Sequence, residues 1–469
     1  MKGMKKTLAL LVIFCMVVTL FTACGSSKSD KEDAAVTDGA SDTEKTDDVE
    51  KADDTEKVDD TESGEKQTLR VTWWGNTERD KLYYKINDLF MKENPNVEIV
   101  TESPGWNDYW TAVATSYASR TAPDVVQFQS NQIGEYASKN VLTPLNSYVD
   151  SGAINLDNWN MDLVSTGNYN ENLYMVTLGI TAQTMYVNKT LCDELGIELW
   201  GEEEDISWED FEKFLNDTQK KLPADTYSCA DFYTNNDLVW VWVRQNTPAG
   251  VEWVDADGKF APTKETMSSW YSLGDRLRKS GAIAPITKTQ EWEQKAWEEG
   301  PFVKRNVLFY FANANQIKTY QRATQDEIVL RKVPVAKNAN NEHGDLLITS
   351  SFAISETSEQ KDLAAKYIDF FVNNEEAQKI FNYELGVPGS LTIQDVLSKT
   401  ADPSDIMATN YVNLVSQNTL PFKAKEPGVW AIQNEIASVA QQVATDSMTA
   451  DKAAEYIIGC ANDVISENQ

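Results

Sequence analysis

Residues 69–100, LRVTWWGNTERDKLYYKINDLFMKENPNVEIV, decide the fold of this chain. Residues 69–74 predict a strand, which Gly75 and Asn76 end. A helix is expected from Thr77, because the apolar residues of 77–93 recur at helical spacing before Asn94-Pro95 ends them. Residues 97–100 predict the next strand. Strand, helix and strand in this order form a βαβ unit, which places the two strands in a parallel sheet.

The same alternation recurs along the chain. A helix is expected over 109–120, followed by the strand VVQF at 125–128. Ser207 is expected to cap the helix that begins WEDFEKFL, and 357–372 has the apolar spacing of an amphipathic helix. The pattern predicts an α/β fold. Residues 67–469 exceed the length that a single core normally supports, so two lobes are expected.

The first 24 residues, MKGMKKTLALLVIFCMVVTLFTAC, predict an exported protein. Three lysines precede an apolar run over 8–23, which is shorter than the roughly 20 residues of a membrane-spanning helix. Ala23 followed by Cys24 resembles the lipobox of bacterial lipoproteins, although Phe21 stands where leucine is usual. Residues 1–23 are therefore expected to be a lipoprotein signal peptide, with an ordinary cleaved signal peptide as the alternative. Acyl chains on Cys24 would anchor the protein at the extracytoplasmic face of the cell membrane.

Residues 24–66 are expected to be the lipidated cysteine and a disordered acidic linker. Residues 25–66 contain no aromatic residue, and DTEKTD, DVEKAD, DTEKVD and DTESGE follow one another from 42 to 65. With 16 acidic residues and 6 lysines, this stretch has too little apolar surface to offset the entropy of folding. We therefore expect residues 25–66 to form a flexible tether between the lipid and the folded body.

Charge and composition exclude several functions for the folded body. The chain has a net charge of −31, which disfavours nucleic acid and anionic lipid as ligands. His343 is the single histidine and lies in the polar stretch NANNEHGD, so a catalytic triad is not expected. Cys192, Cys229 and Cys460 have no metal-binding or redox spacing, and which pair would form a disulfide stays open.

No metal and no cofactor are expected. The stretch DADGK at 255–259 has some likeness to a calcium loop. Placing Gly258 at the sixth loop position puts Trp253 first and Lys264 twelfth, and neither is a calcium ligand. An Asp-Gly hairpin turn is the better interpretation.

The order of several segments resembles a known family over nearly all of residues 67–469. Besides 69–100, the matching segments are TAPDVVQFQSNQIGEYASKNVLTPLNSYVD, GITAQTMYVNKTLCDELGIE with ISWEDFEKFL, WVDADGKFAPT, VLFYFANANQIKTY and LLITSSFAISETSEQKDLAAKYIDFFVNNEEAQKIF. The chain resembles the extracellular solute-binding proteins of carbohydrate-uptake ABC transporters, family 1, the maltose-binding-protein-like group. Thr349-Ser350-Ser351 departs from this family, which often has glycines there.

The resemblance implies a two-lobed, periplasmic-binding-protein-like fold of class II type, with hinge-connected parallel-sheet lobes. The N-terminal lobe is expected to comprise 67–182 and 353–388, and the C-terminal lobe 183–352 and 389–469. The chain is expected to cross between them at 180–184 and 346–351. The ligand would lie in the cleft between the lobes, at the carboxyl ends of the parallel strands.

A sugar offers apolar C–H faces and hydroxyl groups, which aromatic rings and planar polar side chains complement. Such residues are expected on loops that follow strands or begin helices. In the N-terminal lobe the candidates are Trp74, Asn76, Trp106, Asn107, Tyr109, Phe128, Gln129, Ser130 and Asn131. In the C-terminal lobe and the hinge they are Asp231, Trp240, Trp242, Asn313, Asn315, Ser351 and Trp430.

Core packing is the alternative for each aromatic residue. Trp73 and Trp74 point to opposite faces of a strand, so one of them is expected in the core. Trp240 and Trp242 fall on different sides of a helix, so at least one of them is structural. Trp292 and Trp297, in QEWEQKAWEEG, are surrounded by charged residues and are expected to form a partly exposed helix that packs on its neighbour.

The function expected from the sequence is capture of a carbohydrate, an oligosaccharide rather than a single sugar, for delivery to the permease of an ABC importer. The protein would be a monomer with no enzymatic activity, bound to the membrane through its lipid. A secreted glycoside hydrolase that uses two carboxylates is the alternative enzyme. A surface adhesin and a binder of a non-sugar solute are further alternatives.

Overall fold

A computed structural model describes residues 66–468 except 249, 338–344 and 418–421, and it also leaves the side chains of Asn107 and Asp162 undescribed. The expected signal peptide, the Cys24 lipidation site, nearly all of the linker and His343 lie outside these residues. No helix in the described part of the chain combines the length and the apolar composition needed to cross a membrane.

The described residues build one eight-stranded sheet and a separate two-stranded one. In the large sheet the strands run β2-β1-β3-β10-β6-β8-β7, and β9 pairs with β6 on the edge opposite β8. The strands are β1 Gln67–Thr72, β2 Val97–Glu102, β3 Val125–Gln129, β4 Asn168–Tyr169, β5 Asn172–Leu173, β6 Met175–Asn188, β7 Tyr227–Cys229, β8 Val307–Asn313, β9 Ile328–Arg331 and β10 Leu347–Ile354.

The predicted βαβ unit is present. β1 runs parallel to β2 and to β3, with Gln67 opposite Val97 and Val71 opposite Val125. Between β1 and β2 lies α2 (Thr77–Glu93), whose N-cap is Asn76. The α/β prediction is confirmed. The eight-stranded sheet is mixed rather than parallel throughout, because β10 runs antiparallel to β3 and β6, and β6 runs antiparallel to β8 and β9.

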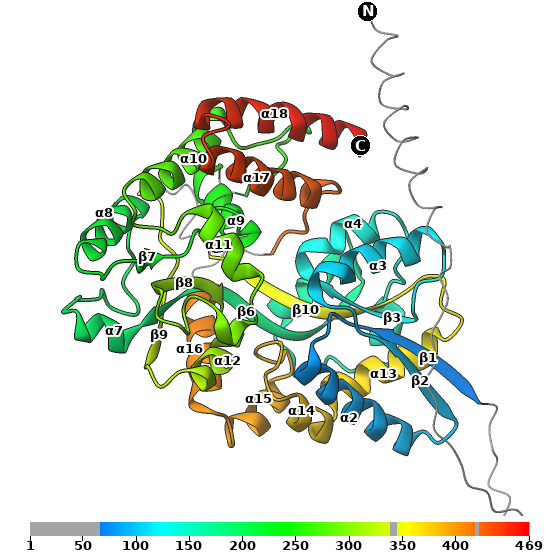
Figure 1. Ribbon diagram of the computed structural model, residues 1–469. Helices are drawn as coiled ribbons and strands as arrows, with labels where there is room; N and C mark the ends of the chain where they lie inside the picture. Colours follow the sequence, from blue (N-terminus) through cyan, green and yellow to red (C-terminus); the bar gives the residue numbers. More distant parts are fainter. Residues whose placement is uncertain (1–65, 249, 338–344, 418–421, 469) are drawn as a thin grey trace, which may run out of the picture. The chain divides into compact units, whose positions relative to one another are not determined.

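Strand β6 carries the chain from one half of the sheet to the other. All 14 of its residues are buried. Residues 175–182 pair with β10, whereas 183–188 pair with β8 and β9. The expected crossings at 180–184 and 346–351 therefore lie within β6 and at the start of β10 (Figure 1).

Two large hydrophobic cores flank this central strand. The N-terminal core takes its residues from 69–178 and 352–385, and the C-terminal core takes them from 185–348 and 429–465. Around the N-terminal core lie α2, α3 (Trp106–Ala118), α4 (Ile133–Ala137), α5 (Asn146–Asp150), α6 (Met161–Ser165), α13 (Lys361–Asn373) and α14 (Glu375–Phe381). The C-terminal core is surrounded by α7 (Lys189–Glu194), α8 (Trp208–Gln219), α9 (Asn236–Asn246), α10 (Lys264–Lys279), α17 (Val429–Ala444) and α18 (Ala450–Glu467).

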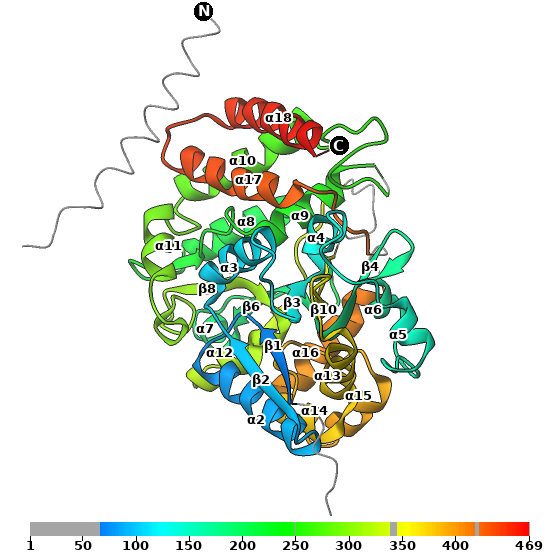
Figure 2. The same cartoon turned by 90° about the vertical axis from the view of Figure 1, so that its right-hand side faces the viewer.

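A third, smaller core joins residues from both halves of the chain. It contains parts of α11 (Ile286–Glu293), α12 (Ile317–Ala323) and α16 (Pro403–Ser416). Short 3-10 turns η2 (Ser130–Gln132), η3 (Trp297–Glu299) and η4 (Ala314–Gln316) complete the described elements. Helix α15 (Leu391–Ser398) follows residue 388 yet contacts α14, which in turn contacts α2 (Figure 2). The lobe boundary at 388 thus stays a prediction.

Local capping signals explain where several helices begin. The side-chain oxygen of Ser207 accepts a hydrogen bond from the backbone N–H of Asp210, as expected for the N-cap of α8. The helix expected over 357–372 begins later, at Lys361, because residues 355–358 form a turn in which the Ser358 N–H donates to the Ser355 oxygen at 3.0 Å. Cys192, Cys229 and Cys460 are free thiols.

Candidate functional site

One cavity has a volume of about 660 Å³, which is within the range of small-ligand sites. Trp106 belongs to the N-terminal group of helices, and the remaining lining residues come from 230–320. Eight of the eighteen lining residues are aromatic. The lining consists of Trp106, Ala230, Asp231, Phe232, Thr234, Asn235, Thr289, Trp292, Glu293, Lys295, Trp297, Gly300, Pro301, Phe302, Tyr310, Phe311, Gln316 and Tyr320.

Trp106 is the first residue of α3, directly after the N-cap Gly105. Its side chain is 41% exposed, although it packs edge-on against Trp74 and Trp110, with ring centroids 5.4 and 5.5 Å away. The buried Trp74 and the half-buried Trp110 support one side of the Trp106 ring and leave its other side open. Trp106 is therefore a rigid apolar platform at the cavity.

The facing wall is built from α11, η3, β8 and α12. Trp297 is 40% exposed, and its ring centroid lies 5.9 Å from that of Tyr320. Tyr320 lies 5.9 Å from Tyr310, and burial raises the pKa of both phenols, so they are neutral hydrogen-bonding groups. Trp292 is buried at the end of α11. Aromatic side chains from four elements thus converge on one space.

Asp231 is a buried carboxylate at the cavity, and the protein already binds both of its oxygens. The guanidinium of Arg278 donates to Oδ2 and, at 3.3 Å, to Oδ1. The backbone N–H of Tyr233 also donates to Oδ1, at 3.0 Å. These charge-assisted hydrogen bonds fix the orientation of Asp231, so its side chain supports the wall of the cavity.

Glu293 is the other carboxylate at the cavity, and its surroundings differ from those of Asp231. Partial desolvation and the nearby charge of Asp231 raise the pKa of Glu293. Lys295 also lines the cavity, and its ammonium pairs with Glu291 at 3.1 Å. In the described residues, no group of three or more histidine, cysteine or acidic side chains is placed to hold a metal ion.

Of the residues predicted from the sequence, the structure places Trp106 and Asp231 in the cavity lining. Trp74 and Tyr109 lie behind Trp106, with ring centroids 5.6 Å apart. The Tyr109 hydroxyl donates to the backbone oxygen of Gln127 at 2.7 Å, so it is engaged in the core. The side chain of Asn107 is outside the described residues.

Three predicted asparagines hold the backbone instead of lining the cavity. Asn76 caps α2 by accepting from the N–H groups of Glu78 and Arg79. Asn313 caps η4 and accepts from the Gln183 amide at 2.8 Å. Asn315 donates to the backbone oxygen of Glu384 at 3.1 Å.

The residues predicted around β3 and β10 lie in or beside the sheet. Phe128 is fully buried against Tyr136. Gln129 accepts from Asn131, and Ser130 accepts from the N–H of Thr349 at 3.2 Å. Ser351 is buried on β10, and its hydroxyl has no hydrogen-bond partner among the described residues. None of these side chains lines the cavity described above.

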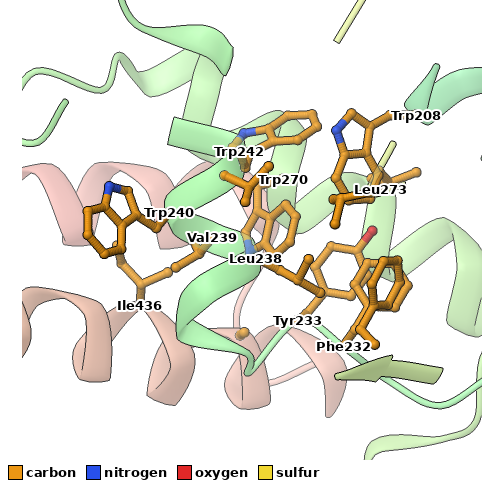
Figure 3. Packing of buried hydrophobic residues seen from close by; sticks show 14 of the residues in the cluster. Trp208, Phe232, Tyr233, Leu238, Val239, Trp240, Trp242, Trp270, Leu273 and Ile436 are labelled. Atoms are coloured by element: carbon orange, nitrogen blue, oxygen red, sulfur yellow. The ribbon is translucent and has the colours of Figure 1, made fainter. Parts of the chain in front are cut away.

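Trp240 and Trp242 occupy the C-terminal core on different sides of α9 (Figure 3). The indole N–H of Trp240 donates to Glu252 at 2.7 Å, and that of Trp242 donates to the backbone oxygen of Thr266 at 2.9 Å. Trp430 lies in the first turn of α17, not in a loop, with its ring 5.9 Å from the Lys425 ammonium.

Sequence reasoning missed most of the cavity's aromatic wall. Trp292 and Trp297 were expected to pack on a neighbouring helix, yet both line the cavity. Their charged neighbours, including Glu298 and Glu299, were the reason for that interpretation. The stronger signal would have been the concentration of Trp292, Trp297, Phe302 and Tyr310 within a short segment, next to the polar Glu293.

Comparison with known families decides the identity of the fold. Residues 74–378 match the model of the bacterial extracellular solute-binding proteins. The chain belongs to this family. The family binds solutes outside the cytoplasm, so the chain is an extracytoplasmic solute-binding protein.

Solved structures share the periplasmic-binding-protein-like fold. A family 1 extracellular solute-binding protein from Alicyclobacillus acidocaldarius is 22% identical, with a TM-score of 0.63, over 86% of this chain and 100% of that one. An ABC substrate-binding protein from Listeria monocytogenes in complex with cycloalternan is 18% identical, with a TM-score of 0.72 and the same coverage. A periplasmic oligogalacturonide binding protein from Yersinia enterocolitica, in complex with saturated digalacturonic acid, is 20% identical, with a TM-score of 0.73, over 86% and 99%.

Proposed function

We propose that this protein captures an oligosaccharide in the aromatic cavity and delivers it to the permease of an ABC importer. The observation that carries the proposal is the pair of exposed indoles, Trp106 and Trp297, at one cavity that also presents Asn235, Gln316 and Glu293. Flat aromatic rings cover the C–H faces of sugars, while amide and carboxylate groups bind their hydroxyls. The volume of about 660 Å³ suits more than a single sugar ring.

The topology supports a transport cycle in which two lobes close on the ligand. β6 and β10 are the strands that connect the N-terminal and C-terminal cores, and Trp106 reaches the cavity from the N-terminal side. A hinge within these strands would bring Trp106 toward Trp297 when a sugar lies between them. The closed form would then be the one that the permease recognises.

The alternative of a glycoside hydrolase rests on the two carboxylates at the cavity. A glycosidase needs one carboxyl group that gives and takes a proton and a second that acts as a nucleophile or a base. Arg278 and a backbone N–H bind both oxygens of Asp231, which leaves Glu293 as the single uncommitted carboxylate of the lining. Binding without hydrolysis therefore fits this lining better.

A glycan panel tests the function. The full-length protein, purified in a non-glycosidic detergent, is expected to gain thermal stability and to change its tryptophan fluorescence with one class of oligosaccharide. The saccharide should be recovered intact after prolonged incubation. Release of reducing sugar over time would replace the receptor proposal with the hydrolase, and the absence of a shift across the panel would favour a non-sugar solute.

The proposed location is the outer face of the cell membrane, with Cys24 lipidated and residues 25–66 as a tether. A tether raises the local concentration of the receptor near a membrane permease and leaves it free to reorient. Replacing Cys24 by serine in a bacterial host is expected to move the protein from the membrane fraction to the medium or periplasm. Retention of Cys24→Ser in the membrane fraction would contradict lipid anchoring.

A further inference from the structure

The charge of the cavity lining carries an inference about which sugars the protein accepts. Three charged side chains line the cavity, namely Asp231, Glu293 and Lys295. Asp231 forms an ion pair with Arg278, whose side chain is only 9% exposed and donates to both carboxylate oxygens. Lys295 is paired with Glu291, which also pairs with Lys288 at 3.4 Å. Each of these two charges therefore has an internal partner.

Glu293 differs, because no described side chain forms an ion pair or a hydrogen bond with its carboxylate. It is the last residue of α11, where the helix dipole disfavours a negative charge. The charge of Asp231 lies nearby and disfavours it further. Glu293 is solvent-exposed at the cavity, so its carboxylate, which has no such partner among the described residues, is accessible to a ligand.

A carboxylate accepts hydrogen bonds and donates none, so it matches the paired hydroxyls of a sugar ring or the ammonium of an amino sugar. A uronic acid would instead bring a second negative charge into a partly desolvated space. Asn235 and Gln316 are neutral, and the neighbouring cations Lys295 and Arg278 already have anionic partners. No cation of the lining would therefore compensate the repulsion between the uronic carboxylate and Glu293.

On the basis of the proposed function, we infer that the cavity takes neutral or amino sugars and rejects uronic acids, with Glu293 as the residue that sets this preference. The similar protein from Yersinia enterocolitica was solved with saturated digalacturonic acid, an acidic sugar. At 20% identity the two chains share a fold, and their ligands are expected to differ in charge.

The test uses matched trisaccharides that differ only in oxidation at C6. The pairs are maltotriose with its fully oxidised triglucuronate, and α-1,4-galactotriose with trigalacturonate, together with the glucosamine trimer as the cationic probe. Isothermal titration of the full-length protein at low salt is expected to give a Kd at least about tenfold lower for the neutral member of a pair than for its uronic counterpart. Glu293→Gln keeps the shape of the side chain and should reduce the ratio of the uronic Kd to the neutral Kd to less than about threefold.

Glu298→Gln is the matched control, because Glu298 is an exposed acid in the adjacent turn η3 that does not line the cavity. It should leave the ratio unchanged. A uronic trisaccharide that binds as tightly as its neutral counterpart would overturn the inference while leaving the proposed function intact, and so would a ratio that Glu293→Gln does not alter. Absence of binding by every trisaccharide would overturn the inference and the proposed function together.

Discussion

The protein uses tryptophan in two settings that differ in exposure and in hydrogen bonding. Trp240 and Trp242 on α9 are 2% and 7% exposed, and each indole N–H donates to an acceptor inside the C-terminal core. Trp106 and Trp297 are 41% and 40% exposed and face one cavity. A tryptophan whose polar edge is satisfied inside the fold contributes to stability, whereas an exposed indole at a cavity offers apolar surface that a ligand can cover.

Replacing a core tryptophan should give the largest effect. Trp240→Ala is expected to lower the free energy of unfolding by about 3–5 kcal/mol, because it opens a cavity and removes the indole donor to the buried Glu252 carboxylate, which keeps its ion pair with Arg244 at 3.3 Å. Denaturant titration measures the loss. Trp106→Ala should change the same quantity by less than about 1 kcal/mol, since its ring is already in contact with water. Equal losses in the two variants would remove the distinction between the two settings.

Replacing the cavity tryptophans, Trp106 and Trp297, should weaken ligand binding more than it lowers the free energy of unfolding. Trp106→Ala and Trp297→Ala are each expected to weaken sugar binding by about 1–3 kcal/mol, because each removes an aromatic surface that the ligand buries. Isothermal titration with the saccharide that gives the largest thermal shift measures this change. Trp106→Phe keeps part of the platform and should fall between the wild type and Trp106→Ala. Unchanged affinity in both alanine variants would place the ligand elsewhere.

Beside Trp240 in the C-terminal core lies Lys425, whose charge should depend on pH. The Lys425 ammonium lies 3.7 Å from the centroid of the Trp240 ring and donates to Gln433. Burial lowers the pKa of Lys425 to about 7, against about 10.4 for an exposed lysine. Between these values the unfolded chain binds more protons than the folded one, so this residue makes stability rise as the pH rises.

The difference in free energy of unfolding between the wild type and Lys425→Met is expected to rise by about 1 kcal/mol per pH unit between about pH 7 and pH 9. Comparison of the two proteins cancels the groups that they share, except Asp237, whose pKa is raised by burial and lowered by the Lys425 charge. A difference between them that stays constant over this range would show that Lys425 keeps its charge in the folded core.

The smallest effect concerns the unpaired carboxylate at the cavity. Glu293→Gln is expected to raise the free energy of unfolding by about 0.3–1 kcal/mol at neutral pH, because it removes a negative charge from the C-terminus of α11 beside Asp231. The raised pKa of Glu293 means that this gain disappears as the pH falls and the carboxyl group takes up a proton. Glu298→Gln should leave stability unchanged, and a loss of stability in Glu293→Gln would show that the carboxylate supports the fold.

The fold could be predicted because its signals are local. Helical spacing over 77–93, the Ser207 cap and the strand VVQF each depend on a few neighbouring residues, and their order matches the family. The antiparallel insertion of β10 was not predicted, because it depends on where a distant segment returns to the sheet. Pairing between remote strands leaves little trace in either segment alone.

The site was harder to predict because it too brings together residues that are far apart in the sequence. Trp106 could be identified from its place after a strand-helix connection, and Asp231 from its aromatic surroundings. Trp297 and Tyr320 are 23 positions apart in sequence, yet their rings lie 5.9 Å apart at the cavity. Polar candidates such as Asn76 and Asn313 have the right chemistry but cap helices, and their spacing to the following residues could have indicated that role.

One measurement tests the central claim most directly, namely isothermal titration of the full-length protein and of the Trp106→Ala Trp297→Ala double variant with the best saccharide of the glycan panel. We expect one saccharide bound per wild-type chain and recovered intact, and a loss of affinity in the double variant of at least about tenfold without loss of thermal stability. Binding of the same saccharide with equal affinity by the wild type and the double variant would contradict it.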